Sequence, residues 1–183
     1  MCKIIFVRHA RPVVDASLAP EDWELSDSGA RAARRAAFEV PASAQVLSST
    51  EHKAIETTAL VTRRGIADVT TDPGFGEVRR REPVDDEFRD RRQAWIAGKP
   101  DNRHQGWESF GAATERMHES LVRHRSDLIV VGTHGMILTA WLMSIGLVPS
   151  GAQAVSFWEG LKLPDIVTVH GDDQLTPESV AFV

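Results

Sequence analysis

Two histidines stand directly after short apolar runs, in positions where they could do chemistry. Arg8-His9 follows Ile4 to Val7, and Thr133-His134 follows Leu128 to Gly132. A neutral imidazole is a nucleophile, and a guanidinium beside it can hold a tetrahedral anion while the imidazole attacks. Taken alone, so short a motif is more often an ordinary surface arginine beside a capping histidine. The placement of both histidines in the fold decides between these interpretations.

The segments before the two histidines predict the strands that position them. Lys3 to Val7 and Leu128 to Gly132 are unbroken apolar runs rich in Ile and Val, typical of central strands covered on both faces. Ligand sites of parallel α/β sheets lie beyond the carboxyl ends of such strands. We therefore expect His9 and His134 to converge at one edge of the sheet.

Strands and helices alternate over most of the chain, which predicts an α/β fold. Further strands are expected at 45–47 and, more weakly, at 67–71, with helices at 30–38, 54–65, 88–96, 108–124 and 136–144. Residues 154–158 and 166–169 are typical of a strand pair at the edge of the sheet. We predict one domain, residues 1–183, forming a three-layer α/β/α sandwich with a mostly parallel sheet and an antiparallel edge strand.

The composition is that of a globular chain that needs no metal or disulfide to hold its core. It has 183 residues, of which 42% are hydrophobic and 26% charged. Its net charge of −5 argues against nonspecific binding to nucleic acid or to an anionic membrane. The single Cys2, the absence of a leader pattern and the lack of an apolar run of ~20 residues predict a cytoplasmic protein without a membrane span. These features leave the oligomeric state open.

Further short motifs follow Arg8-His9 in a definite order. They are Leu25-Ser26 with Gly29, Ser48-Ser49 before Lys53-Ala54, Glu56 to Ala59, Glu77 after Phe75-Gly76, Glu108-Ser109, and Val131 to Gly135. From about Lys3 to Val169, this order resembles the histidine phosphatase superfamily, also called the phosphoglycerate mutase-like family. The two histidine motifs are the specific part of the resemblance, because a pair such as Glu108-Ser109 is common.

The resemblance implies an enzyme that forms a covalent phosphohistidine and uses no metal or other cofactor. His9 is then the nucleophile, and His134 completes the pocket. Arg8 and Lys53 bind the phosphate, together with His134, while Glu77 donates a proton to the leaving group. The implied partner is a small phosphorylated substrate.

The physical demands of the reaction agree with these roles. The attacking nitrogen of His9 must be unprotonated, so its other nitrogen should donate to a backbone carbonyl. The leaving alcohol needs a proton, which a carboxylic acid with a raised pKa supplies for a rate gain of ~10²–10⁴-fold. Glu77 is the expected acid and Glu82 the alternative. Without the resemblance, Glu77 is more simply a solvated acid in a polar loop.

Three positions depart from the family pattern. Lys53 stands where the family usually has a second arginine. Lysine keeps the positive charge but lacks the planar guanidinium that binds an anion through two parallel hydrogen bonds. Ala10-Arg11-Pro12 replaces the usual glycine, acid and small hydroxyl residue. Asp15 lies near the place of a phosphate-contacting asparagine, where a carboxylate repels phosphate unless a cation such as Arg11 pairs with it.

The polar segment 73–107 is expected to be an inserted lid over the substrate. It holds eight basic and seven acidic residues, so a solvated mosaic of ion pairs is about as plausible as a dedicated anion site. Trp95 and Trp107 could stack on a substrate ring, but packing of the segment onto the domain is the more usual role of such aromatics. The substrate is therefore open.

Several functions compete for this pattern. Hydrolysis of a small phosphomonoester is favoured over a mutase, because the inserted segment is modest. Lys53 and Asp15 suggest a noncatalytic phospho-ligand-binding module. Glu77 disfavours a protein phosphohistidine phosphatase, because the histidine of that substrate is a good leaving group that needs little help from an acid. The other histidines lack metal-ligand spacing, and neither a P-loop nor Gly-x-Ser-x-Gly occurs in the sequence.

Overall fold

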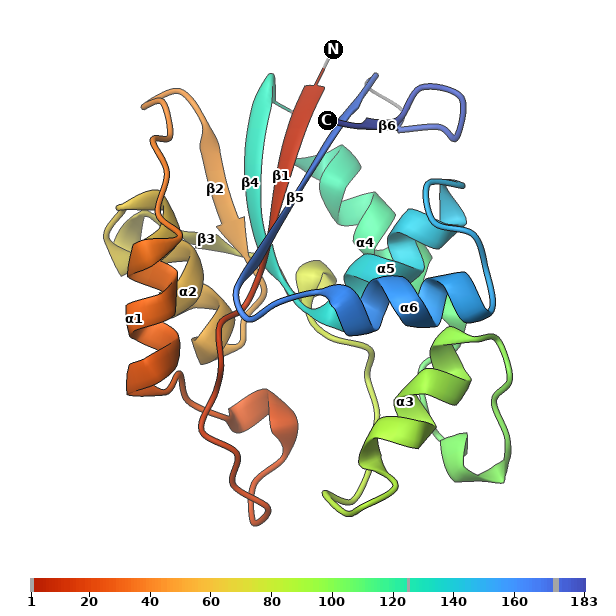
Figure 1. The fold of residues 1–183 in the computed structure, drawn as a ribbon. Helices are drawn as coiled ribbons and strands as arrows, with labels where there is room; N and C mark the ends of the chain where they lie inside the picture. The colour runs from red at the N-terminus through yellow and green to blue at the C-terminus, as the bar shows by residue number, and fades with distance from the viewer. Residues whose placement is uncertain (1, 125, 173–174) are drawn as a thin grey trace.

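A computed structural model describes residues 2–124, 126–172 and 175–183. Within this part of the chain, six strands form one sheet in the order β3-β2-β4-β1-β5-β6 (Figure 1). The strands are β1 (Cys2–Arg8), β2 (Gln45–Ser48), β3 (Thr70–Thr71), β4 (Leu128–Thr133), β5 (Asp165–Gly171) and β6 (Ala181–Phe182). The first four are parallel to one another; β5 pairs antiparallel with β1, and β6 pairs antiparallel with β5.

Helices cover both faces of the sheet, which confirms the three-layer prediction. They are α1 (Asp27–Arg35), α2 (His52–Thr62), α3 (Phe88–Ile96), α4 (Phe110–Arg123), α5 (Gly135–Ser144) and α6 (Ala152–Gly160), with short 3₁₀ turns at Pro20–Asp22, Ile66–Asp68, Pro73–Phe75 and Asn102–His104. Helices α1 and α2 pack on one face, and α4, α5 and α6 lie on the other (Figure 1). No described helix is long and apolar enough to cross a bilayer.

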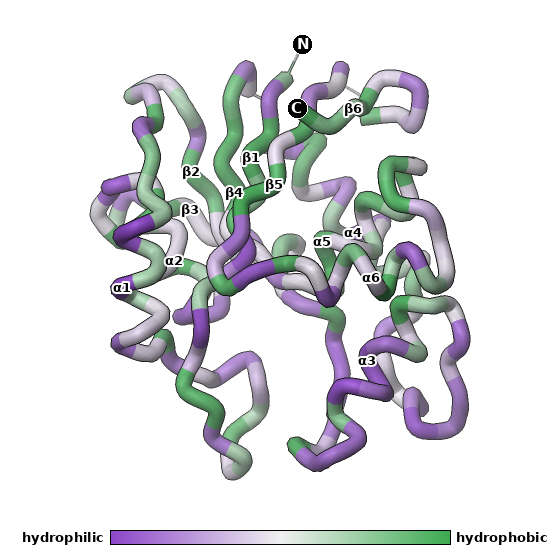
Figure 2. Tube along the Cα trace, in the orientation of Figure 1, coloured by the Kyte–Doolittle hydropathy of each residue, from purple (hydrophilic) through white to green (hydrophobic). Residues whose placement is uncertain are grey.

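The central strand β1 is buried on both faces, as its unbroken apolar run predicts. Ile4 and Phe6 join the large core under α4 and α5, whereas Ile5 and Val7 join the smaller core under α1 and α2. Phe6 packs on Trp141 with ring centroids 5.2 Å apart, and both side chains are fully buried. The hydropathy colouring shows this apolar centre surrounded by polar segments (Figure 2). Burial of each large apolar side chain contributes roughly 1.5–3 kcal/mol to stability.

The predicted edge strand at 154–158 is wrong, because this segment is part of helix α6. Ala154 and Trp158 are buried four residues apart, which is the spacing of one helix face. A short apolar run does not separate a strand from a helix by periodicity alone. The second predicted edge segment, 166–169, is confirmed within β5, but β5 pairs with β1 and β6.

Two other predicted elements differ from the structure in extent. The weak strand expected at 67–71 is reduced to β3, which follows a 3₁₀ turn at Ile66–Asp68. Helix α1 begins at Asp27 instead of residue 30, because Ser26 is its N-cap and accepts a hydrogen bond from the Gly29 amide.

The segment 73–107 carries α3 and lies beside the carboxyl ends of the parallel strands, across from the loop that follows β1 (Figure 1). Trp95 is buried and donates from Nε1 to the Glu108 carbonyl at 3.1 Å. Trp107 packs against the same core. Both tryptophans therefore attach the segment to the domain, and neither lines the cavity described below.

Candidate active site

The carboxyl ends of three adjacent strands bring the predicted histidines together. The amide of His9 donates to the Thr133 carbonyl at 3.0 Å, and the amide of Ser49 donates to the Gly132 carbonyl at 2.9 Å. The rings of His9 and His134 have centroids 5.1 Å apart. The predicted convergence of the two histidines is confirmed.

Close packing at this junction depends on glycine. A Cβ on Gly132 would lie 1.9 Å from Thr58 Oγ1 and 2.7 Å from Ser48 Oγ. A Cβ on Gly135 would lie 3.1 Å from the Arg8 guanidinium carbon. The two glycines that flank Thr133-His134 therefore let α2 and Arg8 approach the end of β4.

His9 is held in the tautomer that nucleophilic attack requires. Its Nδ1 lies 2.8 Å from the Ala10 carbonyl oxygen, and because a carbonyl only accepts, Nδ1 carries the proton. Burial, together with the charges of His134 and Lys53, lowers the pKa of His9 to about 3. At neutral pH the ring is therefore uncharged, and Nε2 keeps its lone pair.

Arg8 lies in the same cavity and is anchored on its far side. Its Nη1 donates to the Leu161 carbonyl at 2.6 Å, on the loop after α6. Burial lowers the pKa of the Arg8 guanidinium, and the carboxylates of Glu77 and Asp165 act in the opposite direction. The guanidinium keeps its charge because its ordinary pKa is so high.

His134 is a neutral hydrogen-bond donor in this structure. Its Nε2 lies 2.8 Å from Ser49 Oγ and 3.1 Å from Glu51 Oε1. Burial lowers the pKa of His134 to about 3, although Glu77 acts to raise it. Among the described residues, Nδ1 of this buried ring has no hydrogen-bond partner.

Glu77 lies at the N-terminus of α5, in the cavity. Its Oε1 accepts from the Ile137 amide at 2.9 Å, and its Oε2 accepts from the Met136 amide at 3.2 Å. Burial acts to raise the pKa of Glu77, but Arg80, His134 and the Val78 amide outweigh it and lower the pKa to about 2. The raised pKa predicted from the sequence is therefore wrong for this arrangement.

Lys53 reaches the cavity from the first turn of α2, but its ammonium is already paired. Nζ forms an ion pair with Glu51 and donates to the Pro20 carbonyl at 2.6 Å. Glu51 also accepts from the Glu77 amide at 3.1 Å. Sequence reasoning missed Glu51; its only signal is a place directly after Ser48-Ser49-Thr50, at the end of a parallel strand.

The loop that carries Glu77 is clamped by an ion pair between Arg116 of α4 and Glu108, which lies two residues before that helix. Arg116 Nη1 donates to the Gly74 carbonyl at 2.7 Å, and Nη2 lies 3.4 Å from the Glu77 carbonyl. Arg116 also binds both carboxylate oxygens of Glu108, at 2.9 and 2.8 Å. Glu108 Oε2 in turn accepts from the Arg79 amide at 3.0 Å, so one pair holds the loop on both sides of Glu77.

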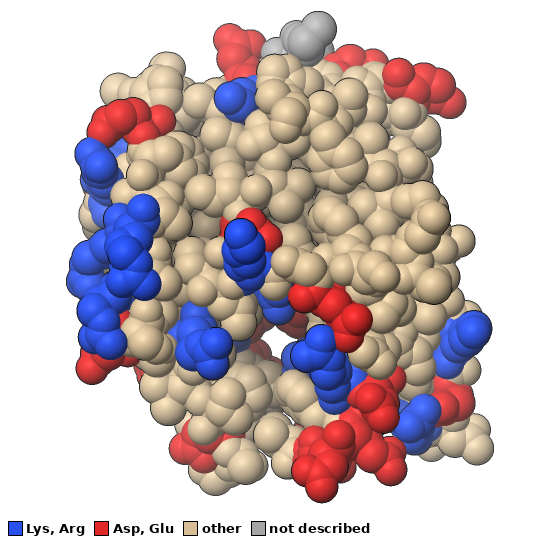
Figure 3. All heavy atoms as spheres, viewed as in Figure 1, with Lys and Arg blue, Asp and Glu red and all other residues tan. Residues whose placement is uncertain are grey.

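These side chains border one cavity of about 860 Å³, large enough for a drug-sized ligand. In the space-filling view the molecule is hollowed at its lower centre, with charged side chains around the opening (Figure 3). The lining includes Arg8, His9, Lys53, Glu77 and His134, the five residues predicted from the sequence, as well as Glu51, Arg11, Trp23, Arg80, Arg92 and Trp158.

Two other candidates lie outside the lining. Asp15 is exposed, and its carboxylate accepts from the amide and hydroxyl of Ser17, both of which lower its pKa. Glu82 is bound by Arg80 and Arg92 and has a side chain only 1% exposed. Asp15 therefore does not confront a bound phosphate, and Glu82 is held as a partner of arginines. In the described part of the chain, no group of three or more His, Cys, Asp or Glu gathers as metal ligands would.

Comparison with known proteins agrees with this geometry. The family profile of the histidine phosphatase superfamily (branch 1) matches residues 4–157, and no curated protein matches significantly. The fold is similar to a mycobacterial glucosyl-3-phosphoglycerate phosphatase, with 17% identity, TM-score 0.65, and coverage of 100% of this chain and 96% of that one.

Two further solved structures share the fold. A Thermus thermophilus protein has 22% identity and TM-score 0.60 over 93% of this chain and 92% of that one. A mutant phosphoserine phosphatase of Entamoeba histolytica, in complex with phosphoserine, has 14% identity and TM-score 0.63 over 100% of this chain and 95% of that one. The family match spans most of the chain and includes both histidines. The chain therefore belongs to branch 1 of the histidine phosphatase superfamily.

Proposed function

We propose that this protein is a phosphatase that hydrolyses a small phosphomonoester through a phosphohistidine on His9. The observation that carries the proposal is the fixed tautomer of His9, whose Nδ1 donates to the Ala10 carbonyl and leaves Nε2 as the nucleophile. His9 lies beside Arg8 and His134 in one cavity, as a phosphate group requires.

The proposed reaction has two steps. In the first, Nε2 of His9 attacks phosphorus, the bond from phosphorus to the ester oxygen breaks, and Glu77 gives its proton to the departing alkoxide. In the second, water attacks the phosphohistidine, Glu77 takes a proton from that water, the bond from phosphorus to nitrogen breaks, and phosphate leaves with His9 restored. Arg8 and His134 stabilise the charge on the phosphoryl oxygens.

The low pKa of Glu77 is compatible with this role because substrate brings charge and a proton. A phosphate dianion in the cavity offsets the positive charges of Arg80 and Arg92, which hold the Glu77 carboxylate ionised, so binding raises the pKa of Glu77. A phosphomonoester has a second pKa of roughly 6 and therefore carries a proton part of the time at neutral pH. Transfer of that proton to Glu77 on binding gives the acid that the first step needs.

The names of two structural neighbours support hydrolysis over mutase activity. Those proteins are described as a glucosyl-3-phosphoglycerate phosphatase and a phosphoserine phosphatase. The alternative is a noncatalytic phospho-ligand-binding module. The pairing of Lys53 with Glu51 supports it, because the ammonium group expected to hold phosphate is already bound to a carboxylate. We also propose that segment 73–107 acts as the cover of the site and that the protein works in the cytoplasm.

The role of Glu77 is tested with esters whose leaving groups differ. Glu77→Gln should slow an alkyl phosphate about 10²-fold or more, and p-nitrophenyl phosphate far less, since its phenolate leaves without a proton. Glu159→Gln is the matched control, because Glu159 is an exposed partner of Arg89. Equal slowing of both esters by Glu77→Gln would remove this residue from the acid role. Transfer of label between two hydroxyls, without release of inorganic phosphate, would favour the mutase.

A further inference from the structure

The carboxylate of Glu51 already binds two of the side chains expected to hold phosphate. Its Oε1 accepts from His134 Nε2 at 3.1 Å, and its Oε2 forms the ion pair with Lys53 Nζ. The side chains of Glu51, Lys53 and His134 are 11%, 4% and 1% exposed, so little water reaches these contacts. An acid therefore shares its hydrogen-bond donors with any phosphoryl group that these side chains bind.

Further contacts hold this carboxylate in place. Glu51 Oε1 also accepts from the Glu77 amide at 3.1 Å. Lys53 Nζ, its other partner, is fixed by the Pro20 carbonyl at 2.6 Å. If Glu51 turned away, three donors on separate parts of the chain would each lose a charge-assisted hydrogen bond. We therefore expect the carboxylate to stay when a phosphoryl group enters the cavity.

A phosphoryl oxygen bound by the same donors lies close to this negative charge. Each hydrogen bond spans about 3 Å, so an oxygen that shares His134 Nε2 or Lys53 Nζ lies within about 6 Å of the Glu51 carboxylate. At that distance, and with an effective dielectric constant of about 20, repulsion between two unit charges weakens binding by about 100-fold. Lys53 offsets part of this repulsion, so we expect each extra negative charge to weaken binding by about 10- to 100-fold.

The two imidazoles bring no positive charge that would offset Glu51. Burial lowers the pKa of both His9 and His134 to about 3, so both rings are uncharged at neutral pH. Arg8 is the cation beside them, and it keeps its charge although burial lowers its pKa. Protonation of a histidine therefore does not compensate for a second negative charge on the phosphoryl group.

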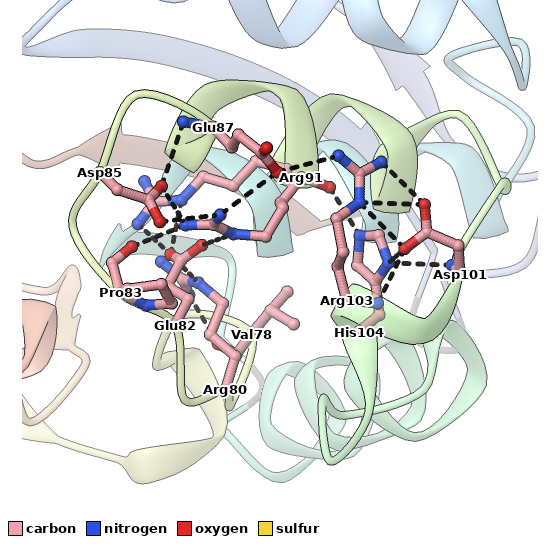
Figure 4. Close-up of polar contacts among 11 residues, drawn as sticks. Val78, Arg80, Glu82, Pro83, Asp85, Glu87, Arg91, Asp101, Arg103 and His104 are labelled. Atoms are coloured by element: carbon pink, nitrogen blue, oxygen red, sulfur yellow. Dashed lines mark hydrogen bonds and ion pairs between the residues drawn. The ribbon is translucent and has the colours of Figure 1, made fainter.

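Segment 73–107 adds a second anion and an arginine that is already paired. Although burial acts to raise the pKa of Glu77, Arg80 and His134 lower it to about 2, so its carboxylate is ionised. Figure 4 shows Arg80 bound to Glu82, a buried acid whose Oε1 lies 2.6 Å from Arg80 Nε. The cavity is therefore better matched to a phosphoryl group with one negative charge than to one with two.

We propose that Glu51 makes the site selective for a phosphoryl group that carries a proton, so that the protein turns over the monoanion of its ester and disfavours the dianion. The P–OH group of a monoanion donates a hydrogen bond to a carboxylate, whereas a dianion has no proton to donate. The inference rests on the proposed function and adds the ionic form of the substrate. The proton is the one that Glu77 delivers to the leaving group. Wherever it lies, the complex carries one negative charge fewer than a dianion would give it.

Anion binding tests this selectivity without turnover. In mildly acidic buffer, inorganic phosphate is mainly a monoanion that carries two protons, whereas sulfate is a dianion that carries none. By calorimetry, the wild-type protein should bind phosphate about 10- to 100-fold more tightly than sulfate. Glu51→Gln keeps the shape of the side chain without its charge, so it should tighten sulfate binding and bring the ratio close to one. An unchanged ratio in Glu51→Gln would overturn the inference.

Two further variants show whether the charge of Glu51 is responsible. Glu51→Asp keeps the charge and should retain most of the preference for phosphate. Glu56→Gln is the matched control, because Glu56 lies on the same helix outside the cavity, and it should keep the full ratio. Circular dichroism melting shows whether each variant folds. Loss of the preference in Glu56→Gln as well would contradict a specific role of Glu51.

The pH dependence of turnover gives a second readout. With p-nitrophenyl phosphate, whose leaving group needs no acid, wild-type kcat/KM should fall as the pH rises through the second pKa of the ester, roughly 6, because the monoanion disappears. Glu51→Gln should also use the dianion, so its kcat/KM at about pH 8 should exceed that of the wild type by about 10- to 100-fold. Identical profiles for the two proteins would overturn the inference.

The two proposals fail in different ways. If the wild type hydrolyses no ester, but binds phosphate more tightly than sulfate and loses this difference in Glu51→Gln, the phosphatase proposal fails and the selectivity stands. If esters are hydrolysed but sulfate binds as tightly as phosphate, the selectivity fails and the phosphatase proposal stands. If neither anion binds and no ester is hydrolysed, both fail.

Discussion

Arg116→Ala removes the side chain that clamps the loop in front of Glu77. In the wild type, Arg116 binds both oxygens of Glu108 and donates to loop carbonyls, the closest being that of Gly74 at 2.7 Å. Loss of one partner of a fully buried pair costs roughly 3–5 kcal/mol. Because the two side chains here keep 13% and 8% exposure, we expect a loss of about 2–4 kcal/mol in the free energy of unfolding.

The same change should disturb catalysis through Glu77. A displacement of a catalytic group by about 1 Å costs up to ~10²-fold in rate. We therefore expect Arg116→Ala to slow an alkyl phosphate at least ~10-fold more than p-nitrophenyl phosphate, which needs no acid. In the Glu77→Gln background, Arg116→Ala should add no further discrimination between the two esters, because the group that it positions is already gone.

Urea unfolding and steady-state kinetics on both esters measure these effects. Arg63→Ala is the control, because Arg63 pairs with Glu39 at the surface and should change little. The stability difference should depend on pH: burial acts to raise the pKa of Glu108, but Arg116 and the Arg79 amide lower it overall. A lowered folded pKa stabilises the protein above the unfolded value, so this contribution is lost as the pH falls through the folded pKa. An equal slowing of both esters by Arg116→Ala would refute the positioning role.

Three further predictions follow from the site. Because the pKa of His9 is lowered to about 3, the NMR shifts of its ring should not change between pH 8 and 5, and a titration near pH 6.5 would contradict this. In the unfolded chain His9 binds a proton near pH 6.5, so the free energy of unfolding should fall as the pH drops below about 6.5. Gly132→Ala should lower the free energy of unfolding, measured by urea denaturation, by about 1–3 kcal/mol, because the added Cβ would lie 1.9 Å from Thr58 Oγ1. Gly111→Ala is the control: an added Cβ there meets no atom within 4 Å, so this variant should be neutral or slightly stabilising. Lys53→Ala should raise KM and leave kcat nearly unchanged if Lys53 is a uniform phosphate anchor, and an unchanged KM would place it outside the binding site.

The strands and the convergence of His9 with His134 could be predicted from the sequence because both follow from local patterns. Unbroken apolar runs define β1 and β4, and parallel strands end at the same edge of the sheet. The helix at 152–160 could not be separated from a strand, since its apolar run is too short for its period to be decisive. There, tertiary packing of Ala154 and Trp158 decides the structure.

The electrostatics of the site could not be predicted, because they depend on residues distant in sequence. The pKa of Glu77 is lowered because Arg80, His134 and the Val78 amide act on its carboxylate. Glu51 pairs with Lys53 and His134 at once, although no short motif marks it. Sequence patterns indicate which residue types reach a strand end, whereas the charge state there depends on every group that packs around them.

Covalent trapping tests the central claim most directly. The wild-type protein is mixed with ³²P-labelled phosphomonoesters, quenched in alkali, and digested to locate the label. The account predicts alkali-stable, acid-labile phosphate on His9, absent from His9→Ala and formed at a rate that supports turnover. Steady release of phosphate by the wild type with no label on His9, or undiminished turnover by His9→Ala, would contradict the account.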